Sequence, residues 1–289
     1  MSRYARHELG QNFLADPDLI AAVQRLVRTG TSGPIIELGA GDGALTRPLA
    51  RLGRPVTALE IDPRRARRLA LNLRAGSADA AGRVEVVCAD ILRHRLPDTP
   101  HTVVGNLPFH LTTAVIRRLL AEPAWTCAVL IVQWEVARRR AGVGGASMLT
   151  ASWWPWYDFR LVRRIPAASF RPVPSVDAGL MTMHRRPVPR VTARRDYQTF
   201  VKEVFQSPGR GLPEMILRTG RVHRSDLHAW LRRNRIPIRA LPKDLTAEHW
   251  AELWELTGPA PRSTDRSEGA RNAAATRSRQ PRWSQGTDR

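Results

Sequence analysis

Cysteine is scarce in this sequence. Its two cysteines, Cys88 and Cys127, stand far apart, and neither has a second cysteine three residues away. Two such thiols make no disulfide framework and no cysteine-based zinc site, and the histidines also lack the spacing of metal ligands. We therefore expect no bound metal. Because both cysteines lie in apolar runs, we expect them to be small residues of the hydrophobic core.

Long apolar runs are also missing. No stretch approaches the roughly 18 apolar residues that a membrane-crossing helix requires. The first ten residues, MSRYARHELG, lack the apolar centre of a signal peptide. These absences predict a cytoplasmic, soluble protein without a membrane partner, and we expect it to act as a monomer.

Acidic residues are too few to balance the basic ones. The chain of 289 residues has 46 Lys and Arg against 26 Asp and Glu, a net charge of +20 and a pI near 11.6. This charge favours a polyanionic partner, because each phosphate contacted releases a condensed counterion. Only Lys202 and Lys243 are lysines. Since such an arginine bias fits a GC-rich genome as well as selection for forked guanidinium contacts, the sign of the charge indicates the partner better than the choice of arginine.

Short apolar segments alternate with amphipathic ones from Pro34 to about Leu180. We expect strands at 34–41, 55–62, 83–90, 101–108 and 127–133. We expect helices at 16–28, 44–52, 63–74 and 112–121. Strand and helix in succession imply an α/β fold, a Rossmann-like parallel sheet with helices on both faces.

The pattern changes in the last third of the chain. Residues 161–186 have extended character interrupted by prolines, which predicts late strands and a loop. Helical patterns without strands follow at 196–206, 213–220, 224–234 and 246–258, and residues 259–289 are rich in Ser, Arg, Ala and Gly. We expect an α/β domain at 1–186, a smaller all-helical domain at 187–258 and a disordered basic tail at 259–289.

Polar and glycine residues stand at the ends of three successive predicted strands. Glu37, Gly39 and Gly41 follow the first strand, Glu60 ends the second and Asp90 ends the third. Glycines let the backbone approach a ligand closely, and a carboxylate at the next strand end accepts hydrogen bonds from ribose hydroxyls. Asp90 is positioned to accept from the amine of an adenine ring. A chance glycine-rich turn explains the glycines alone, but not all three strand ends together.

A dinucleotide site is the main rival explanation for these residues. Gly39, Gly41 and Ala44 satisfy the relaxed GxGxxG/A pattern. However, Gly43 falls at the wrong interval, and the carboxylate of Glu37 would repel a pyrophosphate. The same carboxylate suits a ligand with an ammonium group, so the residues favour S-adenosylmethionine as cofactor.

The fourth predicted strand ends in Asn106-Leu107-Pro108-Phe109, an amide and an aromatic ring on either side of a rigid turn. An adenine amine is a poor nucleophile because its lone pair is delocalised. The side-chain oxygen of Asn106 and the carbonyl of Leu107 would accept from its N–H groups and favour a pyramidal nitrogen. Phe109 would stack on the extruded base. A strand-end turn with a capping Asn and a core Phe is the structural alternative.

Several motifs in fixed order resemble one family. The motifs GQNFL, ELGAGDG, LEID, CADIL, GNLPF and FRPVPSVD resemble the ribosomal RNA adenine N6-methyltransferases over about residues 7–258. The resemblance implies that the cofactor site is lined by Gln11, Asn12, Leu14, Gly39, Gly41, Glu60, Ile61, Asp90, Ile91 and Asn106. Phe109 stands where the family often has Tyr, which keeps the stacking face and loses a hydroxyl.

Two further segments decide between branches of the family. VQWEVARRRAGVGGASMLTA and WWPWYDF resemble the Erm branch, which methylates 23S rRNA and confers macrolide–lincosamide–streptogramin B resistance. This predicts an S-adenosylmethionine-dependent enzyme that modifies an adenine of 23S rRNA. One alternative is the small-subunit rRNA adenine dimethyltransferase of ribosome biogenesis. Another is a non-catalytic RNA-binding protein that keeps the fold.

Arginine clusters are the candidate contacts to rRNA, whose target base must be flipped into the pocket. The candidates are Arg138, Arg139, Arg140, Arg163, Arg164 and Arg171, with Arg185, Arg186, Arg232, Arg233 and Arg235 as additions. For any one arginine a solvated surface position is the simpler explanation. The prediction therefore concerns these arginines as a group and not any single one. We expect the tryptophans of WWPW at 153–156 to pack in the core rather than to stack on bases. Trp250 and Trp254 are spaced to share one helix face, so we expect them in the core of the helical domain.

Overall fold

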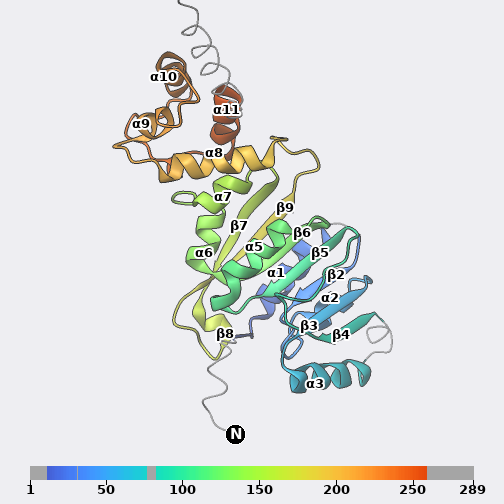
Figure 1. Cartoon of the computed structure of the whole chain (residues 1–289). Helices are drawn as coiled ribbons and strands as arrows, with labels where there is room; N and C mark the ends of the chain where they lie inside the picture. Colours follow the sequence, from blue (N-terminus) through green and yellow to red (C-terminus); the bar gives the residue numbers. More distant parts are fainter. Residues whose placement is uncertain (1–11, 31, 77–82, 259–289) are drawn as a thin grey trace, which may run out of the picture.

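The computed structural model describes residues 12–30, 32–76 and 83–258, and a seven-stranded sheet forms their centre (Figure 1). The strand order is β4-β3-β2-β5-β6-β9-β7. The strands are β2 Ile35–Leu38, β3 Val56–Glu60, β4 Val84–Cys88, β5 His101–Asn106, β6 Trp125–Gln133, β7 Tyr157–Ile165 and β9 Ala178–Arg185. Neighbours from β4 to β6 pair in parallel, which confirms the predicted α/β class, whereas β9 runs antiparallel to both β6 and β7.

Helices cover both faces of this sheet. One face carries α1 Pro17–Arg28, α2 Thr46–Ala50 and α3 Pro63–Arg74, and the other carries α5 Thr112–Ala121 and α6 Trp134–Arg140. Successive strand residues point to opposite faces, so Ile35 packs with α1 while Ile36 packs with α5. Burial on both sides explains why the central strands are continuous apolar runs rather than alternating ones.

The helix starts follow the local sequence closely. Asp16 caps α1, and its Oδ1 accepts from the backbone N–H of Leu19 at 3.1 Å. Asp62 caps α3 in the same way, with Arg64 N at 2.8 Å. A proline occupies the first helical position in both helices, where no hydrogen-bond donor is needed.

The two cysteines differ in environment. Cys127 is buried in β6, as predicted, but Cys88 is exposed at the end of β4. The core prediction for Cys88 is therefore wrong. The reason is that β4 is an edge strand of the sheet, so its apolar residues are only partly covered.

The late segment at 161–186 is extended as predicted, and a short 3-10 turn at Ala167–Ser169 interrupts it. The strand β7 ends at Ile165, the short strand β8 spans Phe170–Arg171, and helices α6 and α7 (Met148–Trp153) precede them. The aromatic run at 153–156 serves packing, since Trp154 and Trp156 are both buried. Trp125 and Tyr157 stack beside it with ring centres 5.0 Å apart.

Four helices follow the sheet, α8 Arg194–Gln206, α9 Leu212–Leu217, α10 Arg224–Arg233 and α11 Ala247–Thr257. They lie at the end of the molecule opposite to β8 (Figure 1). Trp250 and Trp254 of α11 are buried, as predicted, and the apolar core continues from β6 and β9 into these helices. The predicted tail at 259–289 lies outside the described residues. No helix in the described part of the chain is long and apolar enough to cross a membrane.

Candidate active site at the carboxyl edge of the sheet

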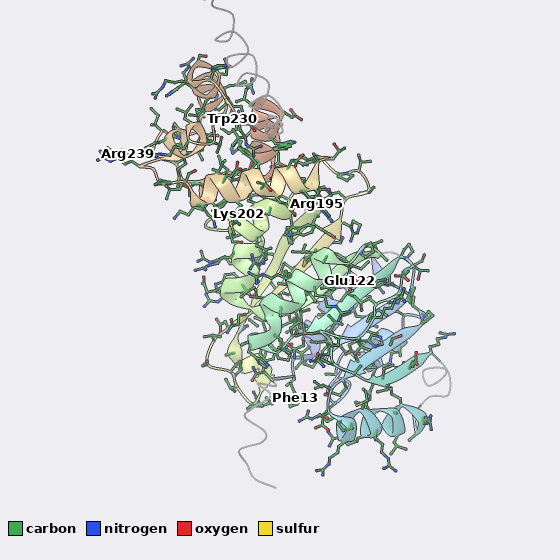
Figure 2. The ribbon with its side chains drawn as sticks, viewed as in Figure 1. Phe13, Glu122, Arg195, Lys202, Trp230 and Arg239 are labelled. Atoms are coloured by element: carbon green, nitrogen blue, oxygen red, sulfur yellow. The ribbon has the colours of Figure 1, made fainter. Side chains whose placement is uncertain are left out.

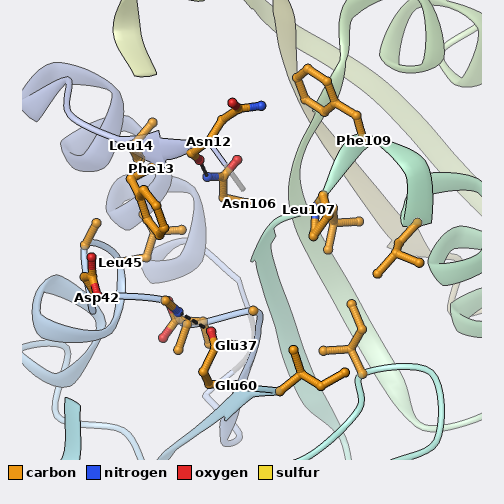
Figure 3. A pocket seen from close by; sticks show the side chains of 18 of the residues that line it. Asn12, Phe13, Leu14, Glu37, Asp42, Leu45, Glu60, Asn106, Leu107 and Phe109 are labelled. Atoms are coloured by element: carbon orange, nitrogen blue, oxygen red, sulfur yellow. Dashed lines mark hydrogen bonds between the residues drawn. The ribbon is translucent and has the colours of Figure 1, made fainter. Parts of the chain in front are cut away.

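A pocket opens where β2, β3 and β5 end and where the loop after β4 begins (Figure 3). Its empty space is about 860 Å³, part of it open to solvent. The predicted cofactor and catalytic residues that line it are Asn12, Leu14, Gly39, Gly41, Glu60, Ile61, Asp90, Ile91, Asn106, Leu107, Pro108 and Phe109. Gln11, the remaining predicted residue, lies outside the described residues.

The glycine turn after β2 forms one wall of the pocket. Gly39 and Gly41 have φ values of 77° and 54°, a left-handed conformation that favours glycine. A Cβ on Gly41 would lie 3.2 Å from the ring of Phe13. Gly43, the glycine that does not fit the dinucleotide pattern, has another purpose, because a Cβ there would lie 2.5 Å from the side chain of Leu69 in α3.

Glu60 connects this turn to β3. The side chain is only 2% exposed, and Oε2 accepts from the backbone N–H of Gly41 at 2.8 Å. The other oxygen, Oε1, accepts from Asp62 N at 2.9 Å. Since two carboxylate oxygens can accept about four hydrogen bonds, Glu60 keeps acceptor capacity toward the pocket.

Asp90 and two isoleucines form the opposite side. Asp90 Oδ1 accepts from Leu92 N at 2.8 Å, whereas Oδ2 is 3.7 Å from the Nε of Arg93. Ile61 lines the pocket with its side chain 51% exposed, and Ile91 is buried. An exposed apolar side chain beside a carboxylate oxygen whose only partner among the described residues is an ion pair at 3.7 Å suits a planar ring with an exocyclic amine.

Arg118 of α5 holds the loop that carries Asp90. Its guanidinium donates to the main-chain oxygens of Ile91 and His94, and it also pairs with Glu122. The helix α5 begins just after the Asn106–Phe109 turn. Arg118 therefore links the two strand-end loops of the pocket, a role that the sequence pattern did not indicate.

Glu37 lies at the base of the pocket and is 2% exposed. Its Oε2 accepts from the hydroxyl of Thr46 at 2.6 Å. Burial raises the pKa of Glu37 to about 8, opposed by the Thr46 hydrogen bond and aided by the negative charge of Glu60. A buried carboxyl of this kind gains most from a cation that enters the pocket.

Asn106 occupies the last position of β5 (Figure 3). Its Nδ2 donates to the main-chain oxygen of Asn12 at 2.7 Å, so the amide nitrogen is used and Oδ1 remains to accept. Leu107 N donates to Ile131 O at 3.0 Å, which holds the turn against β6. The half-buried Phe109 then starts a short 3-10 turn, Phe109–Leu111, and its first and last residues line the pocket.

The N-terminal strand β1, Phe13–Leu14, crosses the pocket by pairing with β8. Phe13 lines the pocket although we did not predict it, and the Arg65 guanidinium of α3 lies 4.5 Å from its ring centre. Its place in the GQNFL motif was a usable indication. Other lining residues without a prior prediction are Ala40, Asp42, Ala44, Leu45 and Leu111. Within the described ranges, no three His, Cys, Asp or Glu side chains gather to hold a metal ion.

The arginines of α6 have three different environments. Arg138 pairs with Glu135 at 2.9 Å, and Arg139 is exposed. Arg140 is half-buried and donates to the Ser147 hydroxyl at 2.6 Å. Burial, and then the charges of neighbouring arginines, lower the pKa of Arg140 to about 10. Arg140 therefore has a packing role in the free protein, whereas Arg139 faces solvent.

The arginines near β7 and β8 lie at the same edge as the pocket, because β7 runs parallel to β6. Arg163 is exposed, while Arg164 pairs with Asp177 at 2.8 Å and lies over the Trp134 ring. Arg171 donates to the main-chain oxygens of residues 168 and 170. Of the additional candidates, Arg185 and Arg186 donate to main-chain oxygens.

Comparisons with known proteins show the family to which the chain belongs. The family model for ribosomal RNA adenine dimethylase matches residues 3–257. The mycinamicin-resistance protein MyrB of Micromonospora griseorubida is 51% identical over 263 residues, 89% of this chain and 82% of the relative. An rRNA adenine N-6-methyltransferase of Corynebacterium diphtheriae is 50% identical, covering 79% and 89%. The crystal structure of the 23S rRNA methyltransferase ErmE superposes with a TM-score of 0.78 at 32% identity, covering 85% of this chain and 99% of the other.

Proposed function

The chain belongs to the ribosomal RNA adenine dimethylase family, and from this premise we propose that it transfers methyl groups from S-adenosylmethionine to the N6 amine of a specific adenine in 23S rRNA. Methylation of this kind gives macrolide–lincosamide–streptogramin B resistance. The observation that carries the proposal is the convergence of Glu60, Asp90 and Asn106 on one pocket. These three side chains come from separate strand ends, and each keeps an oxygen that can accept.

The 23S substrate is favoured over the small subunit by the relatives. Two relatives that are 51% and 50% identical to this chain are a mycinamicin-resistance protein and an rRNA adenine N-6-methyltransferase. A 23S rRNA methyltransferase shares the fold over 85% of this chain. We propose that the protein acts on 23S rRNA as a monomer in the cytoplasm.

The pocket residues fit S-adenosylmethionine. Glu60 would accept from the ribose hydroxyls, Asp90 Oδ2 would accept from the adenine amine, and Ile61 with Ile91 would cover the ring faces. Glu37 would face the charged part of the ligand. When bound, S-adenosylmethionine supplies a methyl group on a positively charged sulfur, which an amine can attack directly.

The protein's part in the reaction is to position and polarise the target amine. The Asn12 carbonyl holds the Asn106 amide nitrogen, so Asn106 Oδ1 is free to accept one N–H of the adenine. The Leu107 main-chain oxygen would accept the other, and Pro108 fixes the turn between them. Both acceptors stabilise the positive charge that develops on the nitrogen. The methylated ammonium is acidic and loses its proton to water, so no strong base is needed.

Phe109 would stack on the flipped adenine, and arginines would hold the surrounding strand. Among the predicted RNA contacts, Arg139 and Arg163 are exposed to solvent. We propose that they contact phosphates and that the helical part at 187–258 adds further RNA contacts. In the free protein, Arg140 and Arg164 already have intramolecular partners, so phosphates would compete with those partners.

The proposal is tested by mass spectrometry of 23S rRNA from cells with and without the protein. We expect methylation of one adenine only when the protein is present, together with macrolide resistance. Purified protein should methylate protein-free 23S rRNA and leave immature small subunits unmodified. Modification of the small-subunit RNA instead would favour the ribosome-biogenesis enzyme, and cofactor binding without methyl transfer would favour a non-catalytic RNA-binding protein.

A further inference from the structure

A second hollow lies far from the pocket, where α9 and α10 meet the turn at 237–240. Figure 2 shows Arg239 at the end of the molecule opposite to Phe13, which lines the pocket. The hollow encloses about 1170 Å³, much of it open to solvent. We call it the arginine hollow, and its chemistry comes from Arg210, Arg218, Arg224, His228, Ile238 and Arg239.

Positive charge in the arginine hollow is largely uncompensated. Its lining includes one carboxylate, Glu214, both of whose oxygens are already engaged. Oε1 accepts from Arg218 Nη2 at 3.0 Å, and Oε2 accepts from the backbone N–H of Arg210 at 3.0 Å. Arg224 and Arg239 are exposed, and neither forms an ion pair with any residue that the structure describes. Four arginines against one carboxylate leave three excess positive charges.

The backbone segments that form the walls of the hollow contact one another closely. The start of α9 is bound to the turn at 237–240, because Leu212 N donates to Ala240 O at 2.7 Å. Gly211 packs so closely there that a Cβ would lie 2.4 Å from the Ile238 oxygen. Arg224 and His228 are one helical turn apart on α10 and face the same side. The backbone segments that carry the cationic groups are therefore already joined before any ligand binds.

An apolar surface accompanies the charges. Ile238 is 66% exposed, although a large aliphatic side chain gains from burial. Guanidinium groups around an open apolar side chain match a sugar-phosphate strand, whose phosphates accept hydrogen bonds and whose ribose and base carbons need contact. An acidic protein segment would also use the charges, but only a nucleic acid repeats charged phosphates with ribose and base carbons along one strand.

We propose that the arginine hollow binds the backbone of a second rRNA segment, outside the hairpin that carries the target adenine. This inference rests on the proposed function. The hollow would anchor the folded RNA by phosphate contacts without reading its sequence, so it would raise affinity for long substrates and leave the methyl-transfer step unchanged.

The test compares the full-length wild-type protein with Arg224→Gln/Arg239→Gln in fluorescence anisotropy. The RNA probes are a long 23S rRNA transcript and a short hairpin that holds only the target adenine and its stem. A matched control, Arg67→Gln/Arg74→Gln, removes the same charge from exposed positions of α3. We expect the hollow variant to lose on the order of tenfold in affinity for the long transcript and to lower the slope of log K against log salt by about 1–2. Hairpin binding should stay within twofold.

A second variant, Ile238→Asp, places a negative charge in the hollow without removing an arginine. It should reproduce the loss on the long transcript. The inference is overturned if the α3 control weakens binding equally, if both hollow variants bind the long transcript normally, or if hairpin and transcript lose affinity alike. Anisotropy measures binding and does not depend on turnover. If the wild-type protein bound RNA but did not methylate it, the proposed function would be wrong, while the inference about the hollow would stand.

Discussion

The side-chain amide of Asn106 at the end of β5 donates to the main-chain oxygen of Asn12, 2.7 Å away and 94 positions earlier in the chain. This hydrogen bond uses the amide nitrogen and leaves the oxygen as the atom that, in our proposal, accepts from the target amine. It also fastens the N-terminal segment over the pocket, next to the strand pair β1–β8. The N-terminal segment and the strand-end turn therefore form one unit.

Substitution of Asn106 should affect turnover more than cofactor binding. Asn106→Ala removes an acceptor that matters as charge develops on the amine, so we expect kcat to fall roughly 10²- to 10³-fold. The KM for S-adenosylmethionine should change much less. Transfer of a labelled methyl group to 23S rRNA measures both, with the exposed Asn72→Ala of α3 as control. Near-normal turnover in Asn106→Ala would refute the amine-orienting role.

The aromatic ring of Phe109 should matter, and its lack of a hydroxyl should not. Base stacking contributes roughly 1–3 kcal/mol, so Phe109→Ala should lower kcat/KM about 5- to 150-fold. Phe109→Tyr keeps the ring and should stay near wild type, and Phe109→Leu, which keeps bulk without a π face, should fall between them. Equal activity of the Ala and Tyr variants would show that no base stacks there.

Arg118 should act through the loop that carries Asp90. Arg118→Lys cannot reach two carbonyls and the Glu122 carboxylate together, so we expect the KM for S-adenosylmethionine to rise roughly tenfold while kcat at saturation is kept. Glu122→Gln removes only the ion pair at 3.4 Å and should bind cofactor normally. Asp90→Ala should raise the same KM at least as much. A fall in kcat without a change in KM would contradict the positioning role of Arg118.

Glu37 should make stability depend on pH. Burial raises its pKa from 4.5 to about 8, so the folded state keeps a proton that the unfolded chain loses. Its stabilising contribution is complete below pH 4.5 and is lost as pH rises toward 8, by up to about 1.4 kcal/mol per pH unit. Relative to Glu37→Gln, wild type should therefore become less stable between pH 5 and pH 8 in thermal or urea unfolding.

A cation bound beside Glu37 should reverse that loss. With saturating S-adenosylmethionine, the difference in unfolding stability between wild type and Glu37→Gln should shrink at pH 8. The ligand's own amine titrates in the same range, so the comparison is made between the two proteins at each pH rather than across pH values. If the stability difference between the two proteins without ligand did not change with pH, Glu37 would be ionised in the empty pocket.

Much of the pocket is determined by local sequence. Apolar runs that stop at a glycine, an acid or an amide mark where β2, β3 and β5 end, and capping aspartates followed by proline mark where α1 and α3 begin. Parallel strands bring their carboxyl ends to one edge of the sheet. The position of Glu60, Asp90 and Asn106 around one cavity therefore follows from the order of elements along the chain.

Other features depend on contacts that no local pattern encodes. The periodicity at 161–186 indicated strands but not that β9 runs antiparallel to β6 and β7, because pairing partners are chosen by the assembled sheet. Cys88 has the same apolar neighbours in sequence as a core residue, yet β4 lies at the edge and leaves it exposed. Arg139 and Arg140 are adjacent, but only Arg140 reaches Ser147 of the next helix.

The sequence by itself determined which residue types stand at the strand ends, since these follow from short-range periodicity and turn chemistry. Only the tertiary structure decided their states: the burial that raises the pKa of Glu37, the Asn12 oxygen that turns the Asn106 amide, and the separation of the arginines into paired and open ones. Burial, hydrogen-bond partners and local charge depend on segments distant in the chain, and these segments meet only when it folds.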